Sequence, residues 1–372
     1  MDIISFATGN TNPESFPTEA FGDAAKRVIS DLTVALNTYP GNMGHPGLRE
    51  LMAQREFDRE GVRVDPEHML ITNGSMQSIM LATEALCTGT DDIVVLEEYC
   101  YVGTISAYRT SGIEMVGIPL DEHGMKVDVL AGTLERLADE GRKPRFIYTL
   151  ATYQNPTGTM MPRDRREKLV ELAAKHDIPV IEDNCYGDVH YDGEKPPALY
   201  ALDDDPRQIY ICSLSKIFAP GVRLGYVIAK PPMLERILAH RMDAGPNTLA
   251  SAITHEYLKD RLWSHIETAN DALKTKRDAM VDGLRRHLGN ECTVTNPPGG
   301  LFVWVRLPDD ADPAALKEIA NRNGVDFAHG SGFHIHNNAG PYIRLAFGFP
   351  SVDQIQEGSK RLGNSLRELR EA

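Results

Sequence analysis

A lysine, two serines and an arginine share one short segment, which reads SLSKIFAPGVR from residue 213 to residue 223. An apolar, strand-like run precedes the segment at 208–212, and a second run follows it at 224–228. The amine of a lysine at a strand end can form a Schiff base with an aldehyde, and hydroxyls with a guanidinium can bind a phosphate. The residue types of this segment would therefore let Lys216 bind a phosphorylated aldehyde. The alternative is a solvated surface lysine beside a salt-bridging arginine.

Three further polar segments follow strand-like runs. Loops at strand ends are where open α/β sheets bind ligands, and small or hydroxyl residues at the start of a helix can bind an anion. These segments are therefore candidate ligand-binding loops. They are YQNPTG at 153–158 after the run 146–150, EDNCYGD at 182–188 after the run 178–181, and NGSMQ at 73–77 after the run 69–72.

The order and spacing of these segments resemble those of the pyridoxal-phosphate-dependent aminotransferases of fold type I, class I/II. The resemblance extends from Ile4 to about Leu366 and is closest to the aminoadipate/kynurenine aminotransferase branch. It implies an enzyme that moves an amino group between an L-amino acid and a 2-oxo acid by a ping-pong mechanism, through an aldimine at Lys216. The supporting sequences are QNPTG at 154–158, YGDVHYDGEKPP at 186–197, APGVRLGY at 219–226 and GGLFVWVRLP at 299–308.

Strand-like runs alternate with helix-period segments, which predicts an α/β fold with a mostly parallel sheet sandwiched by helices. We expect seven strands, the last of them antiparallel by the resemblance, and a smaller α+β C-terminal domain. The predicted organisation is an N-terminal arm at 1–35 that packs on the small domain and a partner subunit, a large cofactor-binding domain at 36–265 and a small domain at 266–372. The strand-like runs lie near 68–72, 92–96, 114–119, 145–150, 178–182, 208–212 and 224–229, and the small domain should contain helices near 263–288, 312–323 and 351–370 and strands at 299–307 and 342–347.

Composition agrees with a globular enzyme of this size. The chain has 372 residues, of which 42% are hydrophobic and 25% charged, enough for one large and one small domain. Its net charge of −14 argues against a nucleic-acid partner. The five cysteines show no CxxC spacing, which favours reduced thiols over a disulfide or metal site. Because the sequence shows neither a signal peptide nor a long apolar run, we expect a cytoplasmic protein with no membrane partner.

The resemblance assigns the chemistry to three catalytic residues, Lys216, Asp183 and Tyr186. Lys216 is expected to carry the cofactor, pyridoxal 5'-phosphate, and, once freed, to move the substrate's α-proton. Asp183 is expected to pair with the pyridine nitrogen, which keeps the ring protonated and able to accept electrons. Tyr186 and Asn155 are expected to hydrogen-bond the cofactor's phenolic oxygen. Taken alone, Asp183 would be interpreted as a cap or turn residue, and Asn155 as part of an Asn-Pro turn.

The resemblance also implies a binding cup for the cofactor's phosphate. Met76 stands where the family usually has a polar residue, so its backbone N–H is expected to make the contact, with Gln77 as an alternative. Tyr101 is expected to stack on the ring, unless it is a core tyrosine. Tyr39 matches a family tyrosine that reaches the phosphate of the other subunit, which implies a homodimer with shared active sites; the alternative is a local turn aromatic. The cup is expected to consist of Ser75, Met76, Ser213, Ser215 and Arg223.

Arg344 is the candidate binding residue for the substrate's α-carboxylate. It lies among apolar neighbours in YIRLAF, where a charge is costly unless it is paired. A carboxylate suits the two-pronged guanidinium, and a buried structural ion pair is the alternative. Asn155 and Gly9 are expected beside the carboxylate, and Thr11 and Glu14 near the substrate's distal end.

Three features depart from the family pattern. Residues 8–11 read TGNT where the branch usually has Gly-Gly-x-Pro, and Cys185 stands where proline usually precedes the cofactor tyrosine. His329, His334 and His336 lie close together, but no acidic partner has clear spacing, so we expect no metal site. Because of these departures, the sequence does not indicate which substrate side chain the pocket accepts.

Two other function hypotheses remain open. The first is a pyridoxal-phosphate-dependent amino-acid oxidase or hydroxylase, cyclase or lyase of specialised metabolism on the same fold. The second is a non-enzymatic regulator, since some transcription factors carry an aminotransferase-like domain behind a DNA-binding helix-turn-helix. We expect the enzyme, because the sequence begins at the aminotransferase arm and is acidic.

Overall fold

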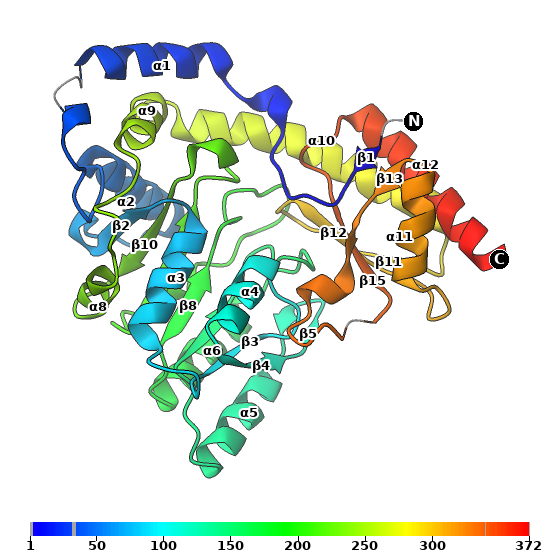
Figure 1. Ribbon diagram of the computed structural model, residues 1–372, viewed down its shortest axis with the longest axis horizontal. Helices are drawn as coiled ribbons and strands as arrows, with labels where there is room; N and C mark the ends of the chain where they lie inside the picture. Colours follow the sequence, from blue (N-terminus) through cyan, green and yellow to red (C-terminus); the bar gives the residue numbers. More distant parts are fainter. Residues whose placement is uncertain (1–2, 32–34, 339, 372) are drawn as a thin grey trace.

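The computed structural model describes residues 3–31, 35–338 and 340–371 and is built around a seven-stranded sheet (Figure 1). Within these residues, only β10 runs antiparallel to its neighbours in that sheet. The mostly parallel seven-stranded sheet is therefore confirmed. In spatial order the strands are β2 (Met69–Thr72), β10 (Gly225–Ala229), β9 (Gln208–Ser213), β8 (Val180–Asp183), β7 (Phe146–Thr149), β3 (Ile93–Glu97) and β4 (Glu114–Ile118).

Helices cover both faces of this sheet. Along β3, Val94 and Leu96 pack into one apolar cluster, while Ile93 and Val95 pack into another. Successive side chains of a strand point to opposite faces, so continuous Ile/Val/Leu runs are buried on both sides. One face carries α3 (Ser75–Leu86), α4 (Val102–Thr110) and α8 (Met233–Ala239), and the opposite face carries α5 (Val127–Asp139) and α6 (Arg163–Lys175).

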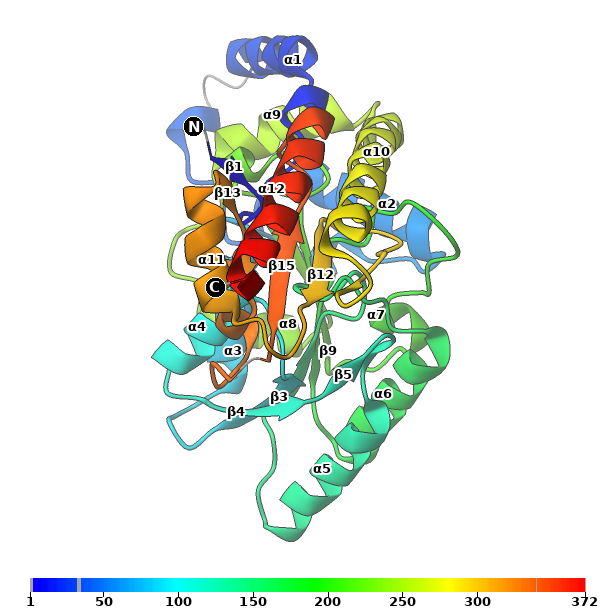
Figure 2. The same ribbon diagram turned by 90° about the vertical axis from the view of Figure 1, so that its right-hand side faces the viewer.

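A second, antiparallel sheet lies in the C-terminal part of the chain, with α11 and α12 beside it (Figure 2). The long helix α10 (Leu262–Leu288) leads to this sheet and crosses the predicted boundary at 265/266 without a break. The predicted two-domain division stays a prediction. The second sheet contains β11 (Thr293–Val294), β12 (Phe302–Arg306), β15 (Tyr342–Ala346) and β14 (Ala328–His329), and the helices are α11 (Pro313–Arg322) and α12 (Val352–Glu371).

The N-terminal segment touches both parts of the molecule. Strand β1 (Ile4–Ser5) pairs in parallel with β13 (Val325–Asp326), whereas α1 (Thr18–Asp31) packs along α9 (Thr248–Leu258), at the outer edge of the view in Figure 1. Residues 1–2 and 32–34 of the predicted arm lie outside the described residues. The remaining elements are α2 (Pro46–Glu60), α7 (Leu199–Leu202), β5 (Leu120–Asp121), β6 (Gly124–Met125) and the 3-10 helices η1 (Pro13–Ser15), η2 (Ala35–Asn37), η3 (Pro66–His68), η4 (Pro220–Val222) and η5 (Gly330–Phe333).

No helix in the described part of the chain combines the length and the apolar character needed to cross a membrane.

Candidate active site

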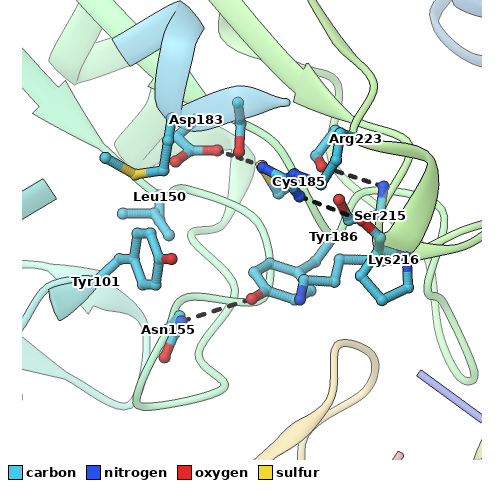
Figure 3. A pocket seen from close by; sticks show the side chains of 13 residues that line it. Tyr101, Leu150, Asn155, Asp183, Cys185, Tyr186, Ser215, Lys216 and Arg223 are labelled. Carbon is cyan, nitrogen blue, oxygen red and sulfur yellow. Dashed lines mark hydrogen bonds between the residues drawn. The ribbon is translucent and has the colours of Figure 1, made fainter. Parts of the chain in front are cut away.

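A cavity opens at the carboxyl ends of β2, β3, β7, β8 and β9 (Figure 3). The strand ends meet there because the five strands run in the same direction, and the loops that follow them supply the polar side chains. The candidate loops of the sequence therefore converge on one place. The lining residues are Ser75, Met76, Tyr101, Leu150, Asn155, Asp183, Cys185, Tyr186, Ser213, Ser215, Lys216, Pro220 and Arg223.

Lys216 follows the end of β9 and turns its amine into the cavity. Its Nζ donates a hydrogen bond to the backbone oxygen of Gly9 at 2.7 Å and lies 6.0 Å from the centre of the Tyr186 ring. Burial lowers the pKa of Lys216, because a charged ammonium is poorly solvated away from water. The alternative of a solvated surface lysine is therefore wrong, and a buried amine of lowered pKa is a better nucleophile.

Asp183 is the last residue of β8, not a loop residue as the sequence suggested. Its two oxygens accept different donors: Tyr148 Oη donates to Oδ2 at 2.6 Å, and Cys185 Sγ donates to Oδ1 at 2.8 Å. Burial raises the pKa of Asp183, although these hydrogen bonds and the nearby Lys216 amine oppose the rise. A cationic partner in the cavity would favour the carboxylate form further.

Arg344 lies mid-strand in β15 and contacts the cavity through Asn155. Arg344 Nη1 donates to Asn155 Oδ1 at 3.0 Å, and Asn155 Nδ2 lies 3.5 Å from the Tyr186 hydroxyl. Arg344 Nη2 donates to the backbone oxygen of Ala7 at 2.5 Å. The cavity, the N-terminal segment and the second sheet therefore meet at this guanidinium.

The Arg344 guanidinium is buried between two aromatic rings. Its Cζ lies 4.2 Å from the centre of Phe302 and 4.5 Å from that of Phe333. Among the described residues it forms no ion pair, and its Nε has no hydrogen-bond partner. Burial lowers its pKa to about 10. The alternative of a buried structural ion pair is thus excluded within the described chain, and an unpaired buried cation is the expected partner of an external anion.

The start of α3 forms an open cradle beside Arg223. The helix begins after Gly74, which has a φ of 87° and provides no side-chain cap. A Cβ on Gly74 would lie 2.6 Å from Arg223 Nη2, and one on Gly225 would lie 2.9 Å from Ser75 N. Uncapped N–H groups at a helix start, next to hydroxyls and a guanidinium, suit a phosphate. These residues and Lys216 therefore fit pyridoxal phosphate.

Several predicted residues lie outside the cavity lining. Tyr39 is 86% exposed and does not contribute to the cavity of its own chain. Gln77 hydrogen-bonds the Asn73 backbone N–H and Asp243 instead of facing the cavity. Glu14 is exposed, and its Oε2 lies 3.8 Å from Lys276 Nζ.

The three histidines do not assemble a metal site in the described residues. His329 Nδ1 accepts from Ser331 N at 3.1 Å, and His334 Nδ1 accepts from His336 N at 3.1 Å. Two of the three side chains thus stabilise local turns.

The sequence did not reveal four of the contacts around the site. Tyr148 was seen only as part of an apolar strand, and Cys185 only as a departure from a pattern. Phe302 and Phe333 are far apart in the chain and meet at Arg344 only in the fold. The one available signal was the hydroxyl of Tyr148 in a run that is otherwise suited to complete burial, where a polar atom needs a partner.

Comparisons with known proteins agree with this arrangement. The family model for aminotransferase class I and II matches residues 1–362. An aromatic-amino-acid aminotransferase of Thermococcus litoralis is 34% identical over 99% of this chain and 88% of its own length. The structure of a Pyrococcus horikoshii kynurenine aminotransferase has a TM-score of 0.94, 34% identity and coverages of 99% and 91%. That of an α-aminoadipate aminotransferase from Thermus thermophilus, complexed with N-(5'-phosphopyridoxyl)-L-leucine, has a TM-score of 0.92, 31% identity and coverages of 99% and 93%.

Proposed function

The chain belongs to the class I and II aminotransferases, and we propose that it transfers amino groups between an L-amino acid and a 2-oxo acid with pyridoxal phosphate bound at Lys216. Members of this family use that cofactor. The observation that carries the proposal is the buried Lys216 amine in one cavity with the buried Asp183 carboxylate, next to an unpaired Arg344 guanidinium. Neither the lysine nor the arginine has an acidic partner among the described residues, so both are available to a ligand.

Different residues of the cavity are suited to hold different parts of the cofactor. When bound, pyridoxal phosphate supplies an aldehyde for the amino group and a ring that accepts electrons. Asp183 would keep a proton on the ring nitrogen, because a carboxylate next to that nitrogen stabilises its charged form. Tyr101 would pack on the ring, and Asn155 and Tyr186 would donate to its phenolic oxygen. Ser75, the backbone N–H of Met76, Ser213, Ser215 and Arg223 would hold the phosphate.

Lys216 and Arg344 act on the substrate. With the cofactor bound, the Lys216 amine, whose pKa burial lowers, would take the proton from the substrate's Cα and deliver it to the cofactor carbon that carried the aldehyde oxygen. Arg344 and Asn155 hold the α-carboxylate, and the backbone of Gly9 closes over it. The Gly9 oxygen, which accepts from Lys216 Nζ, must release the amine before it can act.

A homodimer with shared sites is part of the proposal. Tyr39 and Met242 are 86% and 87% exposed. Asp243, next to Met242, accepts from Asn73 Nδ2 at 3.0 Å, and Asn73 precedes Gly74. Pro40, next to Tyr39, lies close to Gly245, so both exposed side chains come from segments beside the phosphate cradle. A second copy of the chain packed against this surface would bury both side chains away from water. Mixing Tyr39→Phe with Lys216→Ala subunits should restore one intact site per hybrid dimer; an active monomer at all concentrations would contradict the proposal.

The alternative is an oxidase or hydroxylase, cyclase or lyase on the same scaffold, favoured by the unusual TGNT sequence of the arm. A single turnover without any oxo acid separates the two. A transaminase should release one equivalent of oxo acid and stop in the pyridoxamine form, because the amino group remains on the cofactor. Repeated turnover with ammonia release, or with O₂ uptake, would show the alternative to be right.

The cytoplasm is the proposed location. All five cysteines are free in the structure, as expected in a reducing compartment.

A further inference from the structure

Cys185 lies in the turn after β8 and lines the cavity between two of the proposed catalytic residues. It is buried, with 7% of its surface exposed. Its Sγ donates to Asp183 Oδ1 at 2.8 Å, while Tyr148 Oη donates to Asp183 Oδ2 at 2.6 Å. The carboxylate is thus held from both oxygens, by a thiol on one and a hydroxyl on the other.

We propose that Cys185 is a positioning residue that, together with Tyr148, holds the Asp183 carboxylate in its orientation toward the cofactor's ring nitrogen. The proposal rests on the proposed function, since it concerns how Asp183 meets pyridoxal phosphate. A carboxylate that accepts one donor on each oxygen cannot rotate freely, yet each oxygen keeps a second acceptor position. Asp183 lines the cavity, so that second position is available to an N–H in the cavity.

Tyr148 is fixed in turn by its own neighbours. Its hydroxyl lies 3.0 Å from Thr104 Oγ1, and both side chains are buried. The Cys185 thiol also interacts with the side chain of Ser75, one of the residues proposed to bind the phosphate. The two donors belong to different elements: Tyr148 lies in strand β7, whereas Cys185 lies in the turn that also carries Tyr186.

The thiol also supports the charge of Asp183. Burial favours the neutral acid, and the hydrogen bonds from Cys185 and Tyr148 oppose it. Without the thiol, burial would raise the pKa of Asp183 further, and the carboxylate would be a weaker partner for a protonated ring. A serine hydroxyl would preserve the donor, while an alanine would remove it.

The test compares Cys185→Ala and Cys185→Ser with wild type for binding of two cofactors to the apoprotein. One is pyridoxal phosphate, and the other is its 1-deaza analogue, in which a C–H replaces the ring nitrogen. Cys185→Ala should bind pyridoxal phosphate about tenfold more weakly, the scale of one hydrogen bond to a charged group. Cys185→Ser should bind it within about twofold of wild type. Both variants should bind the deaza analogue as wild type does, because that ligand makes no hydrogen bond to Asp183.

Cys292→Ala serves as the matched control, since Cys292 is also buried but lies near β11, away from the cavity. An equal loss of affinity for both cofactors in Cys185→Ala would mean that the thiol only fills space, and this would overturn the inference. Unchanged binding of pyridoxal phosphate by Cys185→Ala would overturn it as well. Failure of the wild type to bind pyridoxal phosphate would instead refute the proposed function, and the inference with it.

Discussion

Replacing Arg344 by lysine should weaken catalysis through the substrate's carboxylate and nothing else. The arginine is buried, has no acidic partner in the described chain, and offers a planar fork whose Nη1 and Nη2 are held by Asn155 and Ala7. Lysine keeps the charge at this position but presents a single ammonium, which cannot make two parallel hydrogen bonds to a carboxylate.

The size of the effect follows from the contacts that are lost. One charge-assisted hydrogen bond is worth roughly 1.5–3 kcal/mol. The Arg344 guanidinium also lies between the rings of Phe302 and Phe333, whose centres are 4.2 and 4.5 Å from Arg344 Cζ. This cation–π stacking orients the guanidinium and contributes roughly 0.5–1 kcal/mol to the interaction energy. The sum, about 2–4 kcal/mol, corresponds to a roughly 30- to 1000-fold lower kcat/KM.

The assay measures kcat/KM for the first half-reaction with an amino acid and with the corresponding amine that lacks the carboxylate. Arg344→Lys should lower the value for the amino acid only. Arg306→Lys, at a partly exposed position on the adjacent strand β12, should leave both unchanged. Wild-type kinetics of Arg344→Lys with the amino acid, or an equal loss with both compounds, would refute the assignment of the carboxylate site.

Three other predictions concern the Lys216 amine and two buried carboxylates. Lys216→Ala should bind pyridoxal phosphate non-covalently, as shown by gel filtration with absorbance detection, yet give no steady turnover. Burial raises the pKa of Glu97 from 4.5 to about 7, so the folded protein keeps a proton that the unfolded chain releases between these values, and stability falls as pH rises through this window. Glu97→Gln removes that loss, and its Tm relative to wild type should be higher at pH 8 than at pH 5. Burial raises the pKa of Asp188, but Arg55 and Arg59 more than offset this and hold it well below its ordinary value of 3.8. The ion pairs therefore stabilise the protein above about pH 4, and Asp188→Asn should lose roughly 3–5 kcal/mol of unfolding free energy in urea at pH 7.

The sheet and the cavity were largely predictable because their signals are local in the sequence. Parallel strands buried on both faces read as continuous apolar runs, so β3 and β9 were located to within a residue or two. Lys216 and Asp183 line one cavity because Asp183 ends β8 and Lys216 follows the end of the neighbouring parallel strand β9.

Contacts between distant segments were not predictable in this way. The rings of Phe302 and Phe333 enclose Arg344 only once β12, β15 and η5 have packed, and no spacing in the sequence encodes that. The hydrogen bond from Lys216 to Gly9 joins residues that are 207 positions apart in the sequence. Tyr39 was singled out through family resemblance alone, because its proposed role depends on a second copy of the chain.

Borohydride reduction of the cofactor-loaded enzyme, followed by peptide mapping, tests the central claim most directly. The reagent converts a Schiff base into a stable amine and so records which lysine carried the cofactor. We predict one labelled peptide, with pyridoxyl phosphate on Lys216, and no label in Lys216→Ala. A label on another lysine, or label that persists in Lys216→Ala, would contradict the account of this site.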